Sequence, residues 1–329
     1  MVCSILTASA LRSKYLSKNA FQTSMSNNRT AVVVGATSGI GEACAHRLAE
    51  QGFTVIAVGR HREGRQQTMI ETLSGFSKAT SEGEDIPKHD FLACDAFNLK
   101  DVKKVADSIQ EKYPTIDALI LTQGMATTQG FTPTVDGNDE KLTLHFWSRM
   151  AFINELLPSL QKSQMPKGAV VVSVLSGGVH SAYKDYKIDP ELKKNYSVAN
   201  AADFAGYFND LCLDQFARKT AGVNFVHASP GFVNTNWGSE FSWMLRTMVR
   251  MMQPLGRSPK ECAEYMVGPT VLASDAGNAL PEKPQGASVI IIGEKGQPKP
   301  LTKAHTEEAR ITCWETTKSV LERAGIEMQ

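Results

Sequence analysis

With 329 residues, the chain is long enough to bury a large core, and it suits one α/β domain of about 250 residues with additions better than two equal halves. The 35 Lys and Arg residues nearly balance the 34 Asp and Glu residues, which gives a net charge of +1. That balance excludes a general attraction to nucleic acid or to anionic membranes. The six cysteines show no C-x-x-C spacing, which predicts reduced, buried thiols in an intracellular protein rather than a disulfide framework or a zinc site.

The first 29 residues differ in composition from the rest of the chain. They contain no acidic residue, and Arg12, Lys14, Lys18 and Arg29 stand among serines. Such a segment is typical either of a mitochondrial presequence or of a basic, disordered tail, and the sequence leaves both open. We therefore expect a location in the cytoplasm or in the mitochondrial matrix. No apolar stretch reaches the roughly 18 residues that a membrane-spanning helix requires.

A glycine-rich turn follows the first apolar run. Val32–Val34 are expected to form a strand buried on both faces, and a helix is expected over Gly41–Gln51. The spacing G-x-x-x-G-x-G, made by Gly35, Gly39 and Gly41, lets the backbone turn sharply and approach a pyrophosphate at the start of that helix. Thr37, Ser38 and Ile40 lie between these glycines and are assigned to the same cofactor site. A tight turn also needs glycine when nothing binds to it, so the motif alone is weak.

Seven short apolar runs, separated by helix-sized intervals, indicate the fold class. After the first run they cover Thr54–Val58, Phe91–Cys94, Ala118–Leu121, Ala169–Val174, Val223–Ala228 and Ala287–Ile292. Continuous Val and Ile runs are typical of strands covered on both faces by helices. The sequence therefore predicts an α/β protein with a doubly wound, parallel, seven-stranded sheet (a Rossmann fold) in a single domain over residues 30–300.

Three further segments complete the expected organisation. Ser74–Asp90, rich in Ser, Gly, Glu and Lys, is expected to be a surface loop. A capping box at Ser258 and Glu261 predicts a helix that continues to about Ala273. Residues 301–329 are expected to be a C-terminal extension with a helix over Thr306–Arg323, packed on the domain or on a partner.

The end of the second strand favours NADP over NAD. NAD-specific folds place an acidic residue there, on the adenosine ribose, whereas this chain has Arg60 and Arg62. A guanidinium suits a 2′-phosphate, although both arginines could equally be solvated loop residues. Asp95, after the third strand, is placed to meet the adenine edge, or else it is a turn carboxylate.

Taken together, these motifs resemble the short-chain dehydrogenase/reductase family over nearly all of residues 30–293. The turn from Gly35 to Gly41 matches the family's glycine motif, although Val34 stands where threonine is usual. Leu121–Gly124 occupies the place of an Asn-Asn-Ala-Gly segment and keeps only the glycine, Gly124. Pro230–Thr235 resembles the family's Pro-Gly-x-x-x-Thr segment. The resemblance implies that this segment cradles the nicotinamide and the pyrophosphate, which assigns Pro230, Gly231, Val233 and Thr235 to the cofactor site.

The resemblance also implies a catalytic serine, a tyrosine and a lysine four residues later, with a supporting asparagine. Ser176, at the end of the fifth strand, matches the serine, and the asparagine is replaced by His145. Tyr196 best matches the tyrosine, but Asn200 stands where the lysine would be. His145 could relay a proton or simply pack in the core.

Two other tyrosines remain candidates. Tyr183 with Lys187 has the literal spacing but lies close to Ser176 and precedes the helix break at Pro190. Tyr207 lies on the long helix expected to run to Lys219, where it is more simply part of a packing face. For Tyr196, Asn200 supplies no cation to lower the phenol pKa, so Lys193, Lys194 or the nicotinamide ring would have to help.

The apolar stretch Phe241–Met252 stands where the family carries a mobile substrate lid, near residues 236–256. Its methionines suggest a flexible wall over an apolar substrate, or a helix that covers the core or docks a subunit in a homo-oligomer; a membrane-surface role comes third. The sequence thus predicts an NADP-dependent oxidoreductase that interconverts an alcohol and a carbonyl on a fairly apolar small molecule. The alternative is a catalytically eroded NADP-binding relative that serves as a redox sensor or assembly partner.

Overall fold

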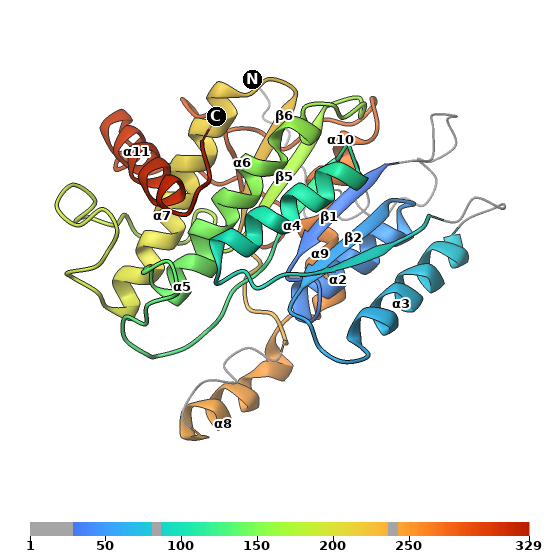
Figure 1. Cartoon of the computed structure of the whole chain (residues 1–329), viewed down its shortest axis with the longest axis horizontal. Helices are drawn as coiled ribbons and strands as arrows, with labels where there is room; N and C mark the ends of the chain where they lie inside the picture. The colour runs from blue at the N-terminus through green and yellow to red at the C-terminus, as the bar shows by residue number, and fades with distance from the viewer. Residues whose placement is uncertain (1–28, 81–86, 236–242, 329) are drawn as a thin grey trace, which may run out of the picture.

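The computed structural model describes residues 29–80, 87–235 and 243–328. Seven parallel strands form one sheet in the order β3-β2-β1-β4-β5-β6-β7 (Figure 1). Their bounds are β1 Thr30–Val34, β2 Thr54–Gly59, β3 Asp90–Ala93, β4 Ala118–Leu121, β5 Ala169–Val174, β6 Val223–Ala228 and β7 Ile290–Ile292. The predicted doubly wound, seven-stranded sheet is therefore confirmed. The last strand is shorter than expected, because only its final three residues pair with β6.

Helices cover both faces of this sheet. One layer contains α2 (Gly39–Glu50), α3 (Arg65–Thr80), α9 (Pro259–Met266) and α10 (Gly268–Ala273). The other contains α4 (Leu99–Lys112), α5 (Glu140–Leu142), the π-helical turn η1 (Thr143–Trp147), α6 (Ser148–Leu160), α7 (Val198–Lys219) and α11 (Glu307–Arg323). Alternate residues of β1 face opposite layers. Val32 and Val34 belong to the core on the side of α4 and α6, whereas Ala31 and Val33 belong to the core on the side of α2 and α9. This two-sided burial explains why the strands appear as continuous apolar runs.

Two sequence expectations about helices were wrong. Ser74–Asp90 is not a loop throughout, because α3 continues to Thr80. Met69, Leu73 and Ser77, spaced four residues apart, bury one side of that helix. The helix expected from Ser258 to Ala273 is divided into α9 and α10, and Pro269, which lacks a backbone N–H, stands at the start of the second.

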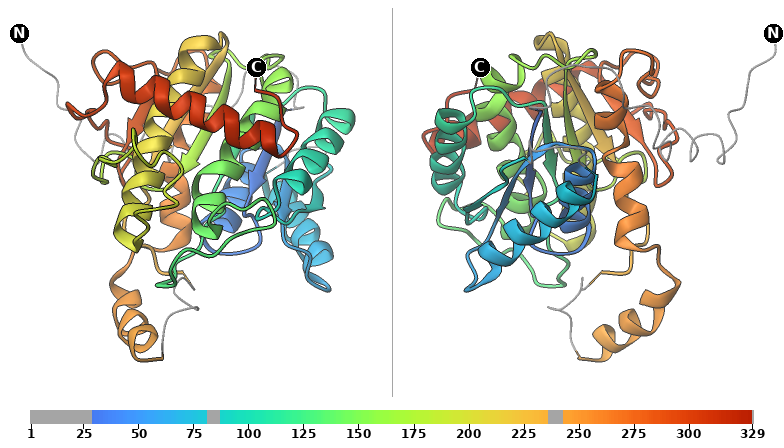
Figure 2. Two further views of the ribbon diagram at one scale, coloured as in Figure 1. Left: turned by 60° about the vertical axis from the view of Figure 1, so that its left-hand side comes forward. Right: turned by 90° about the vertical axis from the view of Figure 1, so that its right-hand side faces the viewer.

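The C-terminal helix packs against α7 on the domain itself (Figure 2). Cys313 and Trp314 of α11 are buried in the same core as Phe208 and Phe216 of α7. Five cysteines are buried free thiols, and Cys3 lies outside the described residues. In the part of the chain that the structure describes, no helix is long and apolar enough to cross a membrane.

Candidate functional site

The turn between β1 and α2 has the close backbone packing that its glycines predict. Gly35 and Gly39 adopt positive φ angles of 84° and 61°. A Cβ atom at Gly41 would lie 2.3 Å from the carbonyl oxygen of Gly35 and 2.3 Å from Thr122 Oγ1, so only glycine fits there without movement. Ser38 precedes α2 without a side-chain capping bond, which leaves N–H groups of the first helical turn available to an anion.

The segment after β6 reaches the same turn. Thr235 carbons lie 3.2 and 3.4 Å from the position that a Cβ atom on Gly39 would occupy. The Gln253 side chain donates a hydrogen bond to the Thr235 carbonyl oxygen at 2.6 Å, and Val233 pairs with Arg257 in an isolated β-bridge. Gly231 has a φ of 68°, and a Cβ atom there would meet the Glu294 side chain. The two cofactor motifs, nearly 200 residues apart in the sequence, thus meet at Gly39 and Thr235.

A hollow of about 540 Å³ lies at the ends of β2 and β3. It is lined by Arg60, His61, Ala93, Cys94, Asp95, Phe97 and Asp101. Asp95 forms a turn, since its Oδ1 accepts the Phe97 N–H at 3.1 Å and its own N–H donates to Asp101 at 2.7 Å. Arg60 is exposed and has no ion-pair partner within the described parts of the chain. In this hollow, the Arg60 guanidinium therefore has no ion-pair partner among the described residues, and the carboxylates of Asp95 and Asp101 each accept a backbone N–H.

His145 supports the loop that follows β4. Its Nε2 accepts the backbone N–H of Met125 at 3.1 Å, and a Cβ atom on Gly124 would lie 2.9 Å from the same nitrogen. Burial, followed by the positive charges of Arg149 and Lys141, lowers the pKa of His145 to about 3. In this structure His145 is therefore a neutral hydrogen-bond acceptor that positions the Gly124 segment.

Ser176 carries a buried hydroxyl. Its Oγ has no hydrogen-bond partner among the described residues, while its backbone N–H donates to His227 Nε2 at 3.2 Å. Gly206 of α7 lies against it, because a Cβ atom there would be 2.5 Å from Ser176 Oγ. An unpaired buried hydroxyl retains its capacity to bind a ligand oxygen.

Tyr196 has different neighbours. Its hydroxyl donates to Asp139 Oδ1 at 3.0 Å, and its ring meets Phe131 edge to face with centroids 5.6 Å apart. Burial and the Asp139 carboxylate raise the pKa of Tyr196. Lys141 Nζ lies 5.3 Å from the centroid of the Tyr196 ring. Among the described residues, it is the cation that contacts this ring. The structure thus gives Ser176 and Tyr196 separate hydrogen-bonding environments.

Asn200 stabilises the start of α7 rather than facing a charged group. Its side-chain amide donates to the Asn195 carbonyl oxygen at 2.8 Å, and its backbone N–H donates to the capping Ser197 hydroxyl at 3.0 Å. Of the upstream lysines, Lys193 pairs with Glu191 at 2.7 Å and Lys194 is exposed. Within the described ranges, neither lysine forms a hydrogen bond with the Tyr196 hydroxyl, which is bonded to Asp139.

The two other candidate tyrosines are buried. Tyr183 donates its hydroxyl hydrogen to the Asp189 carbonyl oxygen at 2.8 Å, and Tyr207 donates to that of Ala304 at 2.5 Å. Burial raises the pKa of both phenols. Both side chains belong to the core, whereas Tyr196 is half-buried and packs at its edge.

Sequence reasoning missed Arg149, a fully buried arginine on α6. Its guanidinium donates to the Gln123 and Val174 carbonyl oxygens at 2.6 and 2.9 Å and to Ser173 Oγ at 2.8 Å. Burial lowers its pKa to about 9. Arg149 thereby joins the ends of β4 and β5 next to Ser176. Its sequence signal is a charge within the mostly apolar first half of α6, between Trp147 and Ile153.

The segment predicted to be a lid forms α8 (Trp243–Met252), which stands away from the body of the domain (Figures 1 and 2). Met244, Met248 and Met251 expose 62%, 58% and 77% of their surface. Residues 236–242, the first part of the predicted lid, lie outside the described residues.

The fold and this arrangement of strand, glycine turn and helix define a doubly wound α/β protein of the Rossmann type. The chain belongs to the short-chain dehydrogenase family of oxidoreductases, whose model, described as "short chain dehydrogenase", matches residues 29–244. This finding confirms the resemblance seen in the sequence.

Curated relatives agree with this family. Oxidoreductase AN1596 of Emericella nidulans is 28% identical over 326 residues, covering 90% of this chain and 94% of the relative. A 3beta-hydroxysteroid dehydrogenase of Mediterraneibacter gnavus is 32% identical over 274 residues, covering 80% and 87%.

Solved structures share the fold. NADPH-bound carbonyl reductase from chicken fatty liver superposes with a TM-score of 0.53 at 18% identity, covering 83% of this chain and 99% of that one. A short-chain dehydrogenase/reductase from Serratia marcescens has a TM-score of 0.54 at 16% identity, covering 77% and 93%.

Proposed function

We propose that the protein is an NADP-dependent oxidoreductase that interconverts an alcohol and a carbonyl on a fairly apolar small molecule. The observation that carries the choice of NADP is the exposed Arg60 beside the hollow at the end of β2. A 2′-phosphate offers that guanidinium a charge-assisted, bidentate partner. The name of one similar protein, an NADPH-bound carbonyl reductase, agrees with the choice of NADP. The name of another, a 3beta-hydroxysteroid dehydrogenase, agrees with an apolar alcohol as substrate.

The residues present fit a dinucleotide. Gly41 lies where any side chain would meet the Gly35 carbonyl, and the first turn of α2 leaves N–H groups free for a pyrophosphate. Thr235 stands beside that turn, and Gly124 beside His145. Bound there, the cofactor would supply or accept the hydride.

In the proposed reaction, the protein binds and orients the substrate oxygen. Ser176 Oγ, which has no partner of its own, would donate a hydrogen bond to that oxygen, and Tyr196 would exchange the proton with it. For this exchange the Tyr196 hydroxyl must leave Asp139. The exposed methionines of α8 would provide the wall against an apolar substrate.

Two observations favour the second candidate, an NADP-binding relative without catalysis. Burial and the Asp139 carboxylate raise the pKa of Tyr196, and Asn200 holds the helix start instead of supplying a cation. Both features oppose proton transfer by Tyr196 near neutral pH. The two candidates share cofactor binding and differ in turnover.

Cofactor preference is tested by titrating the purified protein with NADPH and NADH. We expect Arg60→Ala to weaken NADPH binding by about 10-fold or more and to leave NADH binding nearly unchanged, because one charge-assisted contact is lost. Arg62→Ala is the matched control, since Arg62 is also exposed but does not line the hollow. Equal effects of the two variants, or tighter NADH binding by the wild type, would contradict NADP specificity.

A further inference from the structure

Three side chains that the proposed reaction does not use converge on one face of α7. His180 follows β5, Asp210 lies on α7, and His305 precedes α11, and one ligand atom from each lies within 4.8 Å of the others. Asp210 Oδ2 is 2.8 Å from His180 Nε2 and 3.1 Å from His305 Nε2. The exposed fractions of the three side chains are 4%, 1% and 5%.

A neutral ring accounts for the hydrogen bonds of His227 near Asp210, but it does not account for those of His180. His227 Nε2 accepts the Ser176 N–H, so its Nδ1 carries the hydrogen that faces Asp210 Oδ1 at 2.5 Å. His180 differs, because Nδ1 lies 3.0 Å from the Ser181 carbonyl oxygen while Nε2 faces the Asp210 carboxylate. Both neighbours of His180 are acceptors. Its ring must therefore carry two protons, or Nε2 must bind a cation together with Asp210.

We propose that His180, Asp210 and His305 form a binding site for a divalent transition metal, with Zn²⁺ as the best match. Imidazole nitrogen and carboxylate oxygen are ordinary zinc ligands, and the ligands of a tetrahedral zinc ion lie roughly 3.3 Å apart at bond lengths of about 2.0–2.1 Å. The distances from Asp210 Oδ2 to the two imidazole nitrogens, 2.8 and 3.1 Å, are slightly shorter than this, so small outward shifts of the rings admit the ion.

The groups around these ligands match those that orient zinc ligands in proteins. The second nitrogen of His180 faces a backbone carbonyl. His305 Nδ1 accepts the Thr302 N–H at 3.1 Å, so in this arrangement its ring hydrogen is on Nε2. A metal on Nε2 would displace that hydrogen, and Thr302 Oγ1 and the Thr302 carbonyl oxygen, 2.9 and 3.3 Å from Nδ1, can accept it if it moves to Nδ1. The free oxygen of Asp210 accepts from His227. Acceptors beside the second ring nitrogen favour the tautomer that a metal-ligating histidine needs, and the contact from His227 orients the carboxylate.

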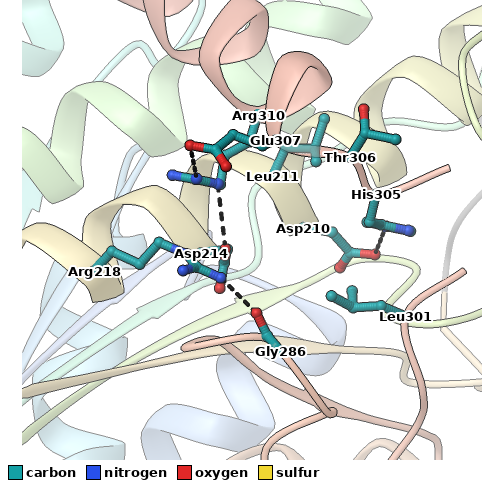
Figure 3. A pocket seen from close by; sticks show the side chains of 10 residues that line it. All are labelled: Asp210, Leu211, Asp214, Arg218, Gly286, Leu301, His305, Thr306, Glu307 and Arg310. Carbon is teal, nitrogen blue, oxygen red and sulfur yellow. Dashed lines mark hydrogen bonds and ion pairs between the residues drawn. The ribbon is translucent and has the colours of Figure 1, made fainter. Parts of the chain in front are cut away.

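A fourth ligand can reach this site from a pocket of about 260 Å³ between α7 and α11 (Figure 3). Asp210 and His305 both line this pocket, which has room for water. The metal would join three segments that are 30 and 95 residues apart in the sequence. It would also steady the end of β5, because Gly206 lets the His180 ring and Ser176 Oγ approach the same point.

The test uses the full-length protein without a histidine tag, saturated with Zn²⁺ and then dialysed. We expect about one zinc per chain by mass spectrometry, and an intense visible absorption when Co²⁺ replaces zinc. Asp210→Asn and His305→Gln should each weaken zinc binding by about 100-fold or more. His46→Gln, which removes a histidine of α2 on the other sheet face, should bind like the wild type.

Circular dichroism separates loss of the site from loss of the fold, and His305→Gln provides a second ligand variant if Asp210→Asn fails to fold. Wild-type protein that is folded but keeps less than about 0.1 zinc per chain and gives no Co²⁺ spectrum would overturn the proposal. The cluster would then be an ion pair between a doubly protonated His180 and Asp210. This readout does not depend on NADPH binding or turnover, so it is independent of the proposed function.

Discussion

Contacts at single residues decide whether the turn after β1 can hold a cofactor. Replacement of Gly41 by alanine would place a methyl group 2.3 Å from the Gly35 carbonyl oxygen, so α2 must move. We expect Gly41→Ala to lower the free energy of unfolding by about 1–3 kcal/mol and to weaken NADPH binding. Thermal denaturation and cofactor titration measure the two effects.

Gly75→Ala is the control for this substitution. Gly75 lies within α3, and its added Cβ would meet nothing within 4 Å. There the helix preference of alanine should raise stability by up to about 1 kcal/mol. A Gly41→Ala protein as stable as the wild type, with unchanged NADPH affinity, would show that the turn tolerates a side chain.

The sequence predicted the glycine turn well because its signal is local: three glycines within seven residues, between an apolar run and a helix. It could not predict that Tyr196 donates to Asp139, 57 residues away, or that His305 meets Asp210 across 95 residues. Those pairs depend on how α7 packs against α5 and against the segment before α11. The periodicity of residues within one segment contains no information about contacts between segments that are far apart in the sequence.

Among the elements, α3 and its neighbours are joined through one buried histidine. His89 Nδ1 accepts the Val55 N–H at 3.1 Å, and its Nε2 lies 2.9 Å from Ser77 Oγ. Burial lowers the pKa of His89 to about 4. The link therefore requires the neutral ring, which connects β2, α3 and the segment entering β3.

This arrangement predicts a pH dependence of stability. Above about pH 6.5 His89 is neutral in both states, but between about 6.5 and 4 the unfolded chain binds a proton that the folded chain does not. As the pH falls through this range, His89 should cost up to about 3 kcal/mol of stability. Urea unfolding at pH 7.5 and 4.5 should show a smaller acid loss for His89→Gln than for the wild type; equal losses would contradict the assignment.

The C-terminal helix depends on a few apolar contacts with α7. Trp314 is 5% exposed and meets the Phe216 ring edge to face at 4.9 Å. We expect Trp314→Ala to lower the free energy of unfolding by about 3–5 kcal/mol. Ile311→Ala, on the exposed side of the same helix at 48% exposure, should change it by no more than about 0.5 kcal/mol. Similar midpoints of denaturation for both variants would mean that α11 is not part of the cooperative domain.

In the whole molecule, the parallel strands bring the segments that follow β1, β4, β5 and β6 to the same end of the sheet. Helix α8 stands apart from the body (Figure 2). The sequence indicated the apolar character of α8, and its methionines are exposed. Its role as a substrate wall or as a subunit contact depends on molecules other than this chain. The apolar substrate and the homo-oligomer therefore stay predictions, and local patterns do not encode which substrate binds.

We propose that this family member still catalyses hydride transfer with Tyr196 as the proton donor. The most direct measurement follows NADPH oxidation with a panel of apolar ketones and aldehydes for the wild type, Tyr196→Phe and Asn200→Lys. We expect the wild type to consume NADPH and Tyr196→Phe to be slower by about 100-fold or more, with cofactor binding retained. Wild-type protein that binds NADPH but turns over nothing, while Asn200→Lys is active, would contradict the claim and identify a cofactor-binding relative without catalysis.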